Sequence, residues 1–306
     1  AAGIEDLTIE SNGTSNFFDA SIGTSKTLTT TGAADLKVTA VDSTLTQVDG
    51  SAATGDLTLD LTAGGAFTSI KTGTGDDSVT VDTLNVEAVL AGGAGADTLV
   101  LKNLAAGTYQ PAMTGFETIK LDSQANAITI AGNASSDLGT IQVLNGLAAA
   151  ATMTFAEFSN SAVNINFVDT KGAANVSNAG TIAYTSAADV TINGTTNNAS
   201  GSARTYNDNV TAANATSVAL NVAKDVIFTG AVTANKATSA TINIAKGGSL
   251  TTGAFDVAKA STVSITADGT MSSAVNAAEA TSVDMTLGAD STFTSKVTAA
   301  KATTVN

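Results

Sequence analysis

The stretch LAGGAGADTLVL (residues 90–101) contains a glycine-rich turn, one carboxylate and an alternating apolar pair, Leu99 and Leu101. Similar apolar pairs recur along the chain every 20–22 residues. They are Val38/Ala40, Leu59/Leu61, Val79/Val81, Leu99/Leu101, Ile119/Leu121, Ile141/Val143 and Val163/Ile165. A register that is kept over this many units indicates an internal repeat.

The C-terminal third carries a plainer version of this repeat. The segments ATSVALNV, ATSATINI, ASTVSITA, ATSVDMTL and ATTVN begin at Ala215, Ala237, Ala260, Ala280 and Ala302. A second strand is predicted between successive segments, at Phe228, Leu250, Met271 and Phe293. In the N-terminal third the intervening strand is predicted from LTQV (45–48), FTSI (67–70) and VEAV (86–89).

The length of the repeat decides the fold class. A unit of 20–23 residues is too small to bury its own apolar face, but stacking on identical neighbours buries it. Apolar residues alternate with period 2, as in half-buried strands, and Gly, Asn, Asp and Ser lie between the alternating runs. No stretch shows the apolar period of a helix. The sequence therefore predicts an all-β parallel β-solenoid (β-helix) with 20–23 residues per coil.

The regularity of the repeat divides the chain into three parts. We expect an N-terminal solenoid segment over residues 1–144 and a regular C-terminal solenoid segment over residues 210–306. Residues 145–209 keep the spacing less well, and NGTTNNASGSARTYNDN (193–209) predicts a loop or break near the middle. The chain begins without Met and ends inside the repeat, which indicates a fragment of a longer protein.

Composition and charge narrow the possible partners. The net charge is −14, so nucleic acid is not an expected partner, because phosphate binding needs clustered Lys and Arg. An acidic chain of this kind is suited to salt solutions or to binding cations. No apolar run is long enough to predict a transmembrane segment.

The acidic turns are the candidate metal site. GGAGAD (92–97) follows TGTGDD (72–77) by one repeat, so Asp77 and Asp97 are expected one strand spacing apart. Two such carboxylates repel, and a Ca²⁺ ion bound by carboxylate and turn carbonyl oxygens relieves the repulsion. The candidate ligands are Gly73, Gly75, Asp76, Asp77, Gly93, Gly95 and Asp97. The alternative is an ordinary Gly/Asp turn that binds nothing, which is the expectation for Asp35 and Asp56.

These turns carry a family resemblance. GGAGADTLV matches the glycine-rich nonapeptide of calcium-binding RTX β-rolls, although that motif recurs here once per 20 residues instead of every nine or so. From GDDSVTVD through GGAGADTLVL to GFETIKL (115–121), the chain resembles calcium-dependent surface-layer (S-layer) proteins of Gram-negative bacteria, of the Caulobacter type. The resemblance implies type I secretion to the cell surface, calcium-driven folding and self-association into a two-dimensional lattice. Any lipopolysaccharide contact is expected through a region outside this chain.

The expected function is therefore structural, not enzymatic. A β-helix lyase usually needs a Lys or Arg base beside a metal carboxylate site, or a His. The chain has no His, and its one Arg lies in the segment expected to form a loop. Asp76 and Asp77 make a poor hydrolase pair, because adjacent strand residues point to opposite faces. An RTX-type adhesin or biofilm matrix protein is the main alternative, and a polysaccharide-active β-helix enzyme is a weaker one. A row of Lys236, Lys259 and Lys301 offers one lattice contact.

Overall fold

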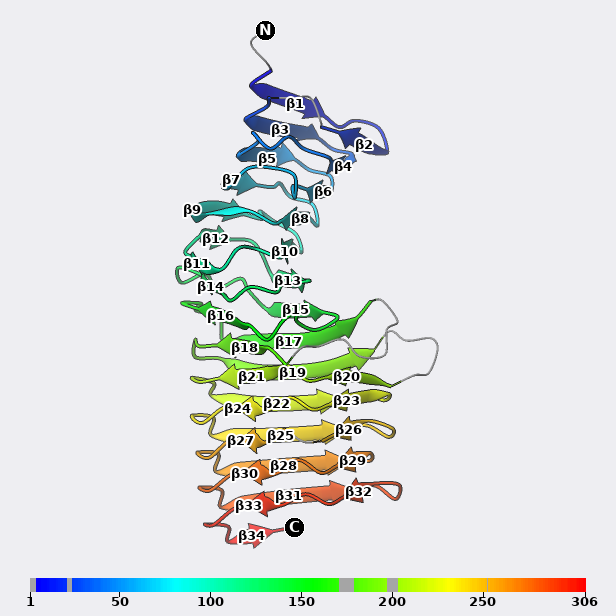
Figure 1. The fold of residues 1–306 in the computed structure, drawn as a ribbon, viewed down its shortest axis with the longest axis vertical. Coiled ribbons are helices and arrows are strands. Elements are labelled where there is room, and N and C mark those ends of the chain that lie inside the picture. Colours follow the sequence, from blue (N-terminus) through cyan, green and yellow to red (C-terminus); the bar gives the residue numbers. More distant parts are fainter. Residues whose placement is uncertain (1–3, 21–23, 171–178, 197–202, 252) are drawn as a thin grey trace. The chain divides into compact units, whose positions relative to one another are not determined.

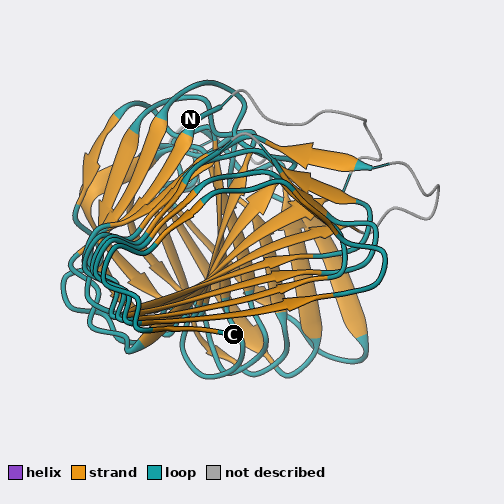
Figure 2. Ribbon diagram, turned by 90° about the horizontal axis from the view of Figure 1, so that it is seen from below, coloured by secondary structure: helices purple, strands orange, loops and turns teal. Residues whose placement is uncertain are grey.

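The computed structural model describes residues 4–20, 24–170, 179–196, 203–251 and 253–306. Within these ranges the secondary structure consists of strands and turns without helices, as Figure 2 shows. The chain divides into two compact units, Ala1–Gly139 and Thr140–Asn306. In each unit short parallel strands from successive turns stack on one another (Figure 1), so the predicted parallel β-solenoid is confirmed.

The first unit is built from two longer sheets and one short strand pair. One sheet contains β1 (Asp6–Glu10), β3 (Thr27–Gly32), β5 (Gln47–Ala53), β7 (Phe67–Lys71), β9 (Leu84–Ala91) and β12 (Ala112–Thr114). The other contains β2 (Ser15–Asp19), β4 (Asp35–Thr39), β6 (Leu57–Asp60), β8 (Ser78–Val81), β10 (Thr98–Lys102) and β13 (Thr118–Asp122). β11 (Gly107–Tyr109) pairs with β14 (Ile128–Ala131).

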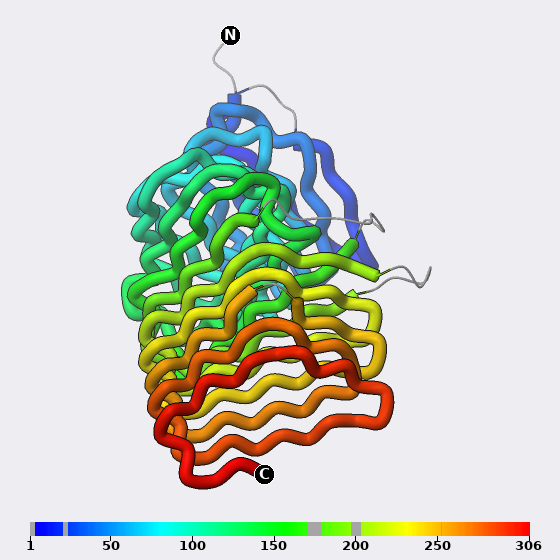
Figure 3. The backbone as a smooth tube through the Cα atoms, turned by 60° about the horizontal axis from the view of Figure 1, so that its bottom comes forward, coloured from blue at the N-terminus to red at the C-terminus, as the bar shows by residue number. Residues whose placement is uncertain are grey.

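The second unit has three sheets. The first, called here the broad sheet, contains β15 (Thr140–Leu144), β17 (Ala162–Asp169), β19 (Asp189–Thr196), β22 (Ser217–Val222), β25 (Ser239–Ile244), β28 (Thr262–Ala267), β31 (Ser282–Leu287) and β34 (Thr304–Val305). The next contains β16 (Thr152–Ala156), β18 (Thr181–Tyr184), β21 (Asn209–Ala212), β24 (Val232–Thr233), β27 (Phe255–Asp256), β30 (Val275–Asn276) and β33 (Val297–Thr298). The last contains β20 (Arg204–Tyr206), β23 (Val226–Phe228), β26 (Ser249–Leu250), β29 (Thr270–Met271) and β32 (Thr292–Phe293). From β22 onward the chain visits the three sheets in a fixed order, which Figure 3 shows as nearly superimposable turns.

The core of each unit is a stack of apolar side chains that point inward. Leu59, Val79 and Leu99 lie opposite one another in β6, β8 and β10, and each is at most 1% exposed. Burying a side chain of this size stabilises the fold by about 1.5–3 kcal/mol. In the second unit Phe228, Leu250, Met271 and Phe293 are aligned in the same way, as the spacing predicted.

The turns in the predicted irregular segment are longer than the rest. Ile141 lies opposite Ile165, not opposite Val163, and the next partners are Ile192 and Leu220. These three turns therefore contain 24, 27 and 28 residues, beyond the predicted 20–23. In the 27-residue turn the longest connection is between β17 and β18, and in the 28-residue turn it is between β19 and β20. β17, β19 and β22 nevertheless pair without a shift of register.

The expected loop over residues 193–209 coincides partly with strands. Residues 193–196 complete β19, and residues 204–206 form β20. Residues 197–202 lie outside the described residues. The segment 145–209 thus contains β16 to β20 and, like residues 210–306, belongs to the second unit.

Three predicted inward positions of the first unit are wrong. In β9 the buried residues are Leu84, Ala88 and Leu90, and Leu90 lies opposite Ile70. Val86 and Val89 are 51% and 41% exposed. The pairing of β7 with β9 shifts register after Phe67, so the apolar-x-x-apolar spacing of FTSI does not carry over to VEAV. Ala40 also faces solvent, because its positive φ of 53° ends the alternation after Val38.

The register of β9 can be tested with one pair of substitutions. Leu90→Ala should lower the free energy of unfolding by about 2–5 kcal/mol, because it leaves a cavity in the core. Val89→Ala should change it by about 0.5 kcal/mol or less, because that side chain borders solvent. Urea unfolding followed by circular dichroism measures both. A larger loss for Val89→Ala would mean that the predicted alternation, and not this register, is right.

Candidate functional site

The acidic turns of the first unit precede consecutive strands of one sheet. Ser78 lies opposite Thr98, so Asp77 and Asp97 occupy equivalent positions immediately before β8 and β10. Each of these two side chains is 1% exposed. The register thus brings the two predicted carboxylates to the same place in adjacent turns and removes them from water.

The buried carboxylates bind the backbone of the preceding turn. Asp77 Oδ1 accepts the N–H of Leu57 at 2.7 Å, and Asp97 Oδ1 accepts the N–H of Asp77 at 2.8 Å. Glu117 Oε2 accepts the N–H of Asp97 at 2.7 Å. We call Asp77, Asp97 and Glu117 the inner carboxylate ladder. Each member satisfies a backbone donor that would otherwise lose its partner at the entrance to a strand.

A second row of carboxylates lies on the solvent side and reaches the opposite way. Asp35 Oδ1 accepts the N–H of Asp56 in the following turn at 3.1 Å, and Asp56 Oδ1 accepts the N–H of Asp76 at 2.8 Å. Asp76 Oδ1 accepts the N–H of Ala96 at 2.8 Å. All three are exposed, and Asp35 and Asp56 also link neighbouring turns. Asp76 is exposed whereas the adjacent Asp77 is buried, although both lie in the turn before β8 and not on the strand.

The four candidate glycines are required for two different reasons. Gly93 and Gly95 have φ values of +101° and +134°, which L-residues with a Cβ rarely adopt. At Gly73 the constraint is space, since a Cβ would lie 2.0 Å from the carbonyl oxygen of Ala53. A Cβ on Gly75 would lie 2.7 Å from Asp56 Oδ1. The glycines therefore let successive turns approach closely, which is what brings the carboxylates into line.

The inner carboxylate ladder is electrostatically strained. Burial raises the pKa of Asp97 to about 6, and the charges of Asp77, Glu117 and Asp76 add to the effect, against the lowering by the N–H of Asp77. Burial also raises the pKa of Asp77, although its hydrogen bonds oppose the shift. Asp97 Oδ2 is buried and has no hydrogen-bond partner in the described part of the chain. Such an oxygen carries negative charge without compensation.

Asp97 Oδ2, the buried oxygen without a hydrogen-bond partner among the residues described, is the atom that makes this site suitable for calcium. Asp97 Oδ2 is available to a cation, and turn carbonyls at the candidate glycines are ligands of the type that Ca²⁺ accepts. Across the described ranges, however, no three or more His, Cys, Asp or Glu side chains gather in a group that could hold a metal ion. An ion bound here would thus depend on main-chain oxygens more than on carboxylates.

Glu117 was not among the predicted ligands. It lies 20 residues after Asp97, at the same place in the next turn, so the repeat spacing was the signal that could have identified it. Asp137 likewise reaches back one turn and accepts the N–H of Gly115 at 2.7 Å.

Comparison with known proteins does not assign the site. No protein-family model matches the chain, and neither the curated proteins nor the solved structures contain a significant match. The described residues also include no helical segment able to span a membrane. Function therefore has to be inferred from the geometry and chemistry of the chain itself.

The raised pKa of Asp97 predicts an unusual pH dependence of stability without metal. Because the folded pKa lies above the unfolded value of 3.8, the free energy of unfolding should fall as pH rises from about 4 to about 6 and level off above. Asp97→Asn keeps an oxygen for the N–H of Asp77 and removes the charge. It should flatten this part of the profile and stabilise the metal-free protein at pH 7 by up to about 3 kcal/mol.

Denaturant unfolding at pH 4 to 8 in the presence of a chelator measures this profile. Asp35→Asn is the control, because that carboxylate is exposed, keeps an oxygen for the N–H of Asp56 and is not among the charges that raise the pKa of Asp97, so the profile should stay unchanged. An Asp97→Asn profile that parallels the parent between pH 4 and 6 would contradict the assignment.

Proposed function

We propose that this chain is a structural segment of a secreted, calcium-stabilised surface layer of a Gram-negative bacterium, which assembles with its own copies into a two-dimensional lattice. The observation that carries the proposal is the inner carboxylate ladder. Three carboxylates from successive turns lie in register there, and one oxygen of Asp97 is buried without a partner.

Calcium is the cation that these groups favour. It binds carboxylate and carbonyl oxygens in flexible arrangements, whereas Mg²⁺ demands a stricter octahedral geometry. Asp97 would supply a carboxylate oxygen, and the turns at residues 72–75 and 92–95 would supply main-chain oxygens. A bound Ca²⁺ contributes the positive charge that the ladder lacks, so the apo protein is expected to be less stable than the calcium-loaded one.

The placement of the basic groups supports a structural role over a catalytic one. Arg204, the only arginine, is fully buried, and its Nε lies 2.6 Å from Asp169 Oδ2. It is therefore not accessible to a substrate as a catalytic base. Asp76 is exposed whereas Asp77 is buried and accepts the N–H of Leu57, which argues against the two acting as a catalytic carboxylate pair.

The row that contains Lys236, Lys259 and Lys301 would offer a contact for self-association, although one of its positions is occupied by a glutamate. Lys236 and Lys259 precede successive strands of the broad sheet, but the next position is Glu279, which contacts Lys301. The row is thus mixed in charge, and a neighbouring copy would meet both signs. A mixed row of this kind favours a fixed register between molecules over non-specific attraction.

Calcium binding predicts a rise in melting temperature. Calorimetry in calcium and in chelator should differ by several degrees, since a ligand at 100 times its Kd stabilises the folded state by about 2.7 kcal/mol. Asp97→Asn should remove most of the calcium effect. Asp268→Asn, at a partly exposed site of the second unit, is the control and should keep it. An unchanged melting curve in the parent would exclude calcium stabilisation.

Lattice formation is tested separately by electron microscopy of the purified protein. Ordered sheets should appear after addition of calcium and dissolve in chelator. Calcium stabilisation without ordered sheets would contradict the surface-layer assignment and support an adhesin or matrix protein. Charge reversal at both Lys236 and Lys259 should impair sheet formation but not the calcium-dependent rise in melting temperature.

A further inference from the structure

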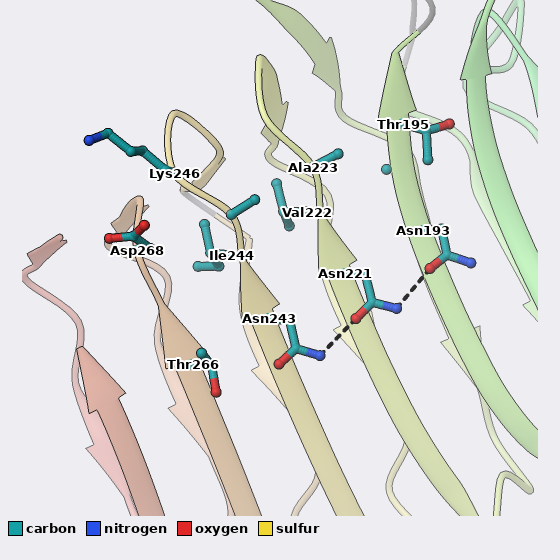
Figure 4. Close-up of a pocket in the computed structure, with 12 residues that line it drawn as sticks. Asn193, Thr195, Asn221, Val222, Ala223, Asn243, Ile244, Lys246, Thr266 and Asp268 are labelled. Carbon is teal, nitrogen blue, oxygen red and sulfur yellow. Dashed lines mark hydrogen bonds between the residues drawn. The ribbon is translucent and has the colours of Figure 1, made fainter. Parts of the chain in front are cut away.

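The outer face of the broad sheet carries a column of asparagines, one in each of four successive turns. Asn193 Nδ2 donates to Asn166 Oδ1, Asn221 Nδ2 to Asn193 Oδ1, and Asn243 Nδ2 to Asn221 Oδ1, each at 2.8 Å. Figure 4 shows two of these bonds. We call Asn166, Asn193, Asn221 and Asn243 the amide ladder. Thr266 continues the column in the next turn.

The amide ladder leaves hydrogen-bonding capacity directed outward. A primary amide has two N–H donors and an oxygen with two lone pairs. Asn193 and Asn221 each use one N–H donor and one oxygen lone pair within the ladder. Each therefore keeps a second N–H donor and a second lone pair that the ladder does not use. Because the ladder bonds fix the rotation of the amides, these free groups repeat in one orientation at about 4.8 Å, the strand spacing.

A groove of about 510 Å³ runs beside the amide ladder. Thr195 and Ala223, which Figure 4 labels, also line the groove, as does Ala245. These three residues come from three successive turns, and their small side chains leave the space open. The groove therefore follows the stacking direction of the turns. Its volume falls within the range of about 300–1,000 Å³ that is typical of ligand sites.

Among the residues that the structure describes, only Lys246, which is paired with Asp290, and Asp268 bring a charge to the lining of the groove. Lys246 lines one end of it, and its ammonium contacts the carboxylate of Asp290. Asp268 also lines that end. Apart from these two residues, the groove is lined by uncharged ones, including the apolar Val222 and Ile244, so one positive and one negative group leave it without excess charge although the chain has a net charge of −14. A polyanion is therefore a poor occupant.

An extended peptide also fits this groove poorly. Peptides that join a sheet do so at a free edge, through main-chain hydrogen bonds. β22 and β25 are interior strands of the broad sheet, paired on both sides with β19 and β28. The groove thus offers side-chain amides and no free backbone edge. Its occupant must hydrogen-bond with groups that both donate and accept, and must place C–H surface against alanines.

We infer that this groove binds a neutral oligosaccharide, extended along the stacking direction with its sugar units against successive turns. Sugar hydroxyls both donate and accept, so they match the paired free groups of Asn193 and Asn221. The C–H faces of the rings match Ala223 and Ala245. The inference does not depend on the proposed lattice or on calcium, because the groove lies wholly in the second unit.

The probe for this site is cellohexaose, a neutral extended oligosaccharide, titrated into the full chain and followed by calorimetry and by NMR shifts of the asparagine amides. The parent should bind it. Asn221→Ala interrupts the amide ladder at its centre and should weaken binding about tenfold or more. Ala223→Arg fills the groove and should abolish binding. Asn276→Ala is the matched control, since that amide donates to Asp256 on a different sheet, and it should bind like the parent.

Melting temperatures show whether each variant is folded, and Ala223→Arg, at a partly exposed position, keeps the test valid if Asn221→Ala destabilises the solenoid. Absence of any shift with millimolar cellohexaose overturns the inference. So does equal affinity in the parent and Ala223→Arg. Tighter binding of hexagalacturonate, an acidic oligosaccharide, or of a neutral threonine–valine hexapeptide would also overturn it.

Discussion

The parallel hydrogen-bond register between successive turns is the constraint on which the rest of this structure depends. Each strand residue lies beside the equivalent residue of the next turn. Side chains of one kind can therefore stack on side chains of the same kind. Leu59, Val79 and Leu99 form a continuous core for this reason. Each turn alone would leave its apolar face in water, so a turn is stable only because it packs against the turns on either side of it.

Stacking like on like has opposite consequences for amides and for carboxylates. An amide is both donor and acceptor, so the amides from Asn166 to Asn243 can bond to one another and still keep groups for a ligand. A carboxylate is only an acceptor, and the inner carboxylate ladder must take its donors from the backbone of the preceding turn. Those bonds hold the charges in place without neutralising them, which is why burial raises the pKa values of Asp77 and Asp97. Both proposals follow from this contrast: a cation for the carboxylates, and a neutral, hydroxyl-rich ligand for the amides.

Local spacing was a good guide where the turns are short and of equal length, and a poor one where their length changes. Phe228, Leu250, Met271 and Phe293 were placed correctly from their spacing alone. The prediction of Val163 opposite Ile141 was wrong by two residues, because it assumed a constant turn length. Glu117 was missed although its spacing from Asp97 was visible, since a glutamate without a preceding glycine-rich turn does not resemble its neighbours in the ladder.

The sequence by itself determined the fold class, the inward face of most strands and the alignment of Asp77 with Asp97, because period 2 and a repeat of 20 residues leave few other solutions. Only the tertiary structure decided which way each carboxylate reaches, which residues of β9 are buried, and that Arg204 lies in the core beside Asp169. The partner of Arg204 is 35 residues away, across one of the longest turns. Contacts of this kind depend on turn length and on main-chain conformation, and residue alternation contains no information about either.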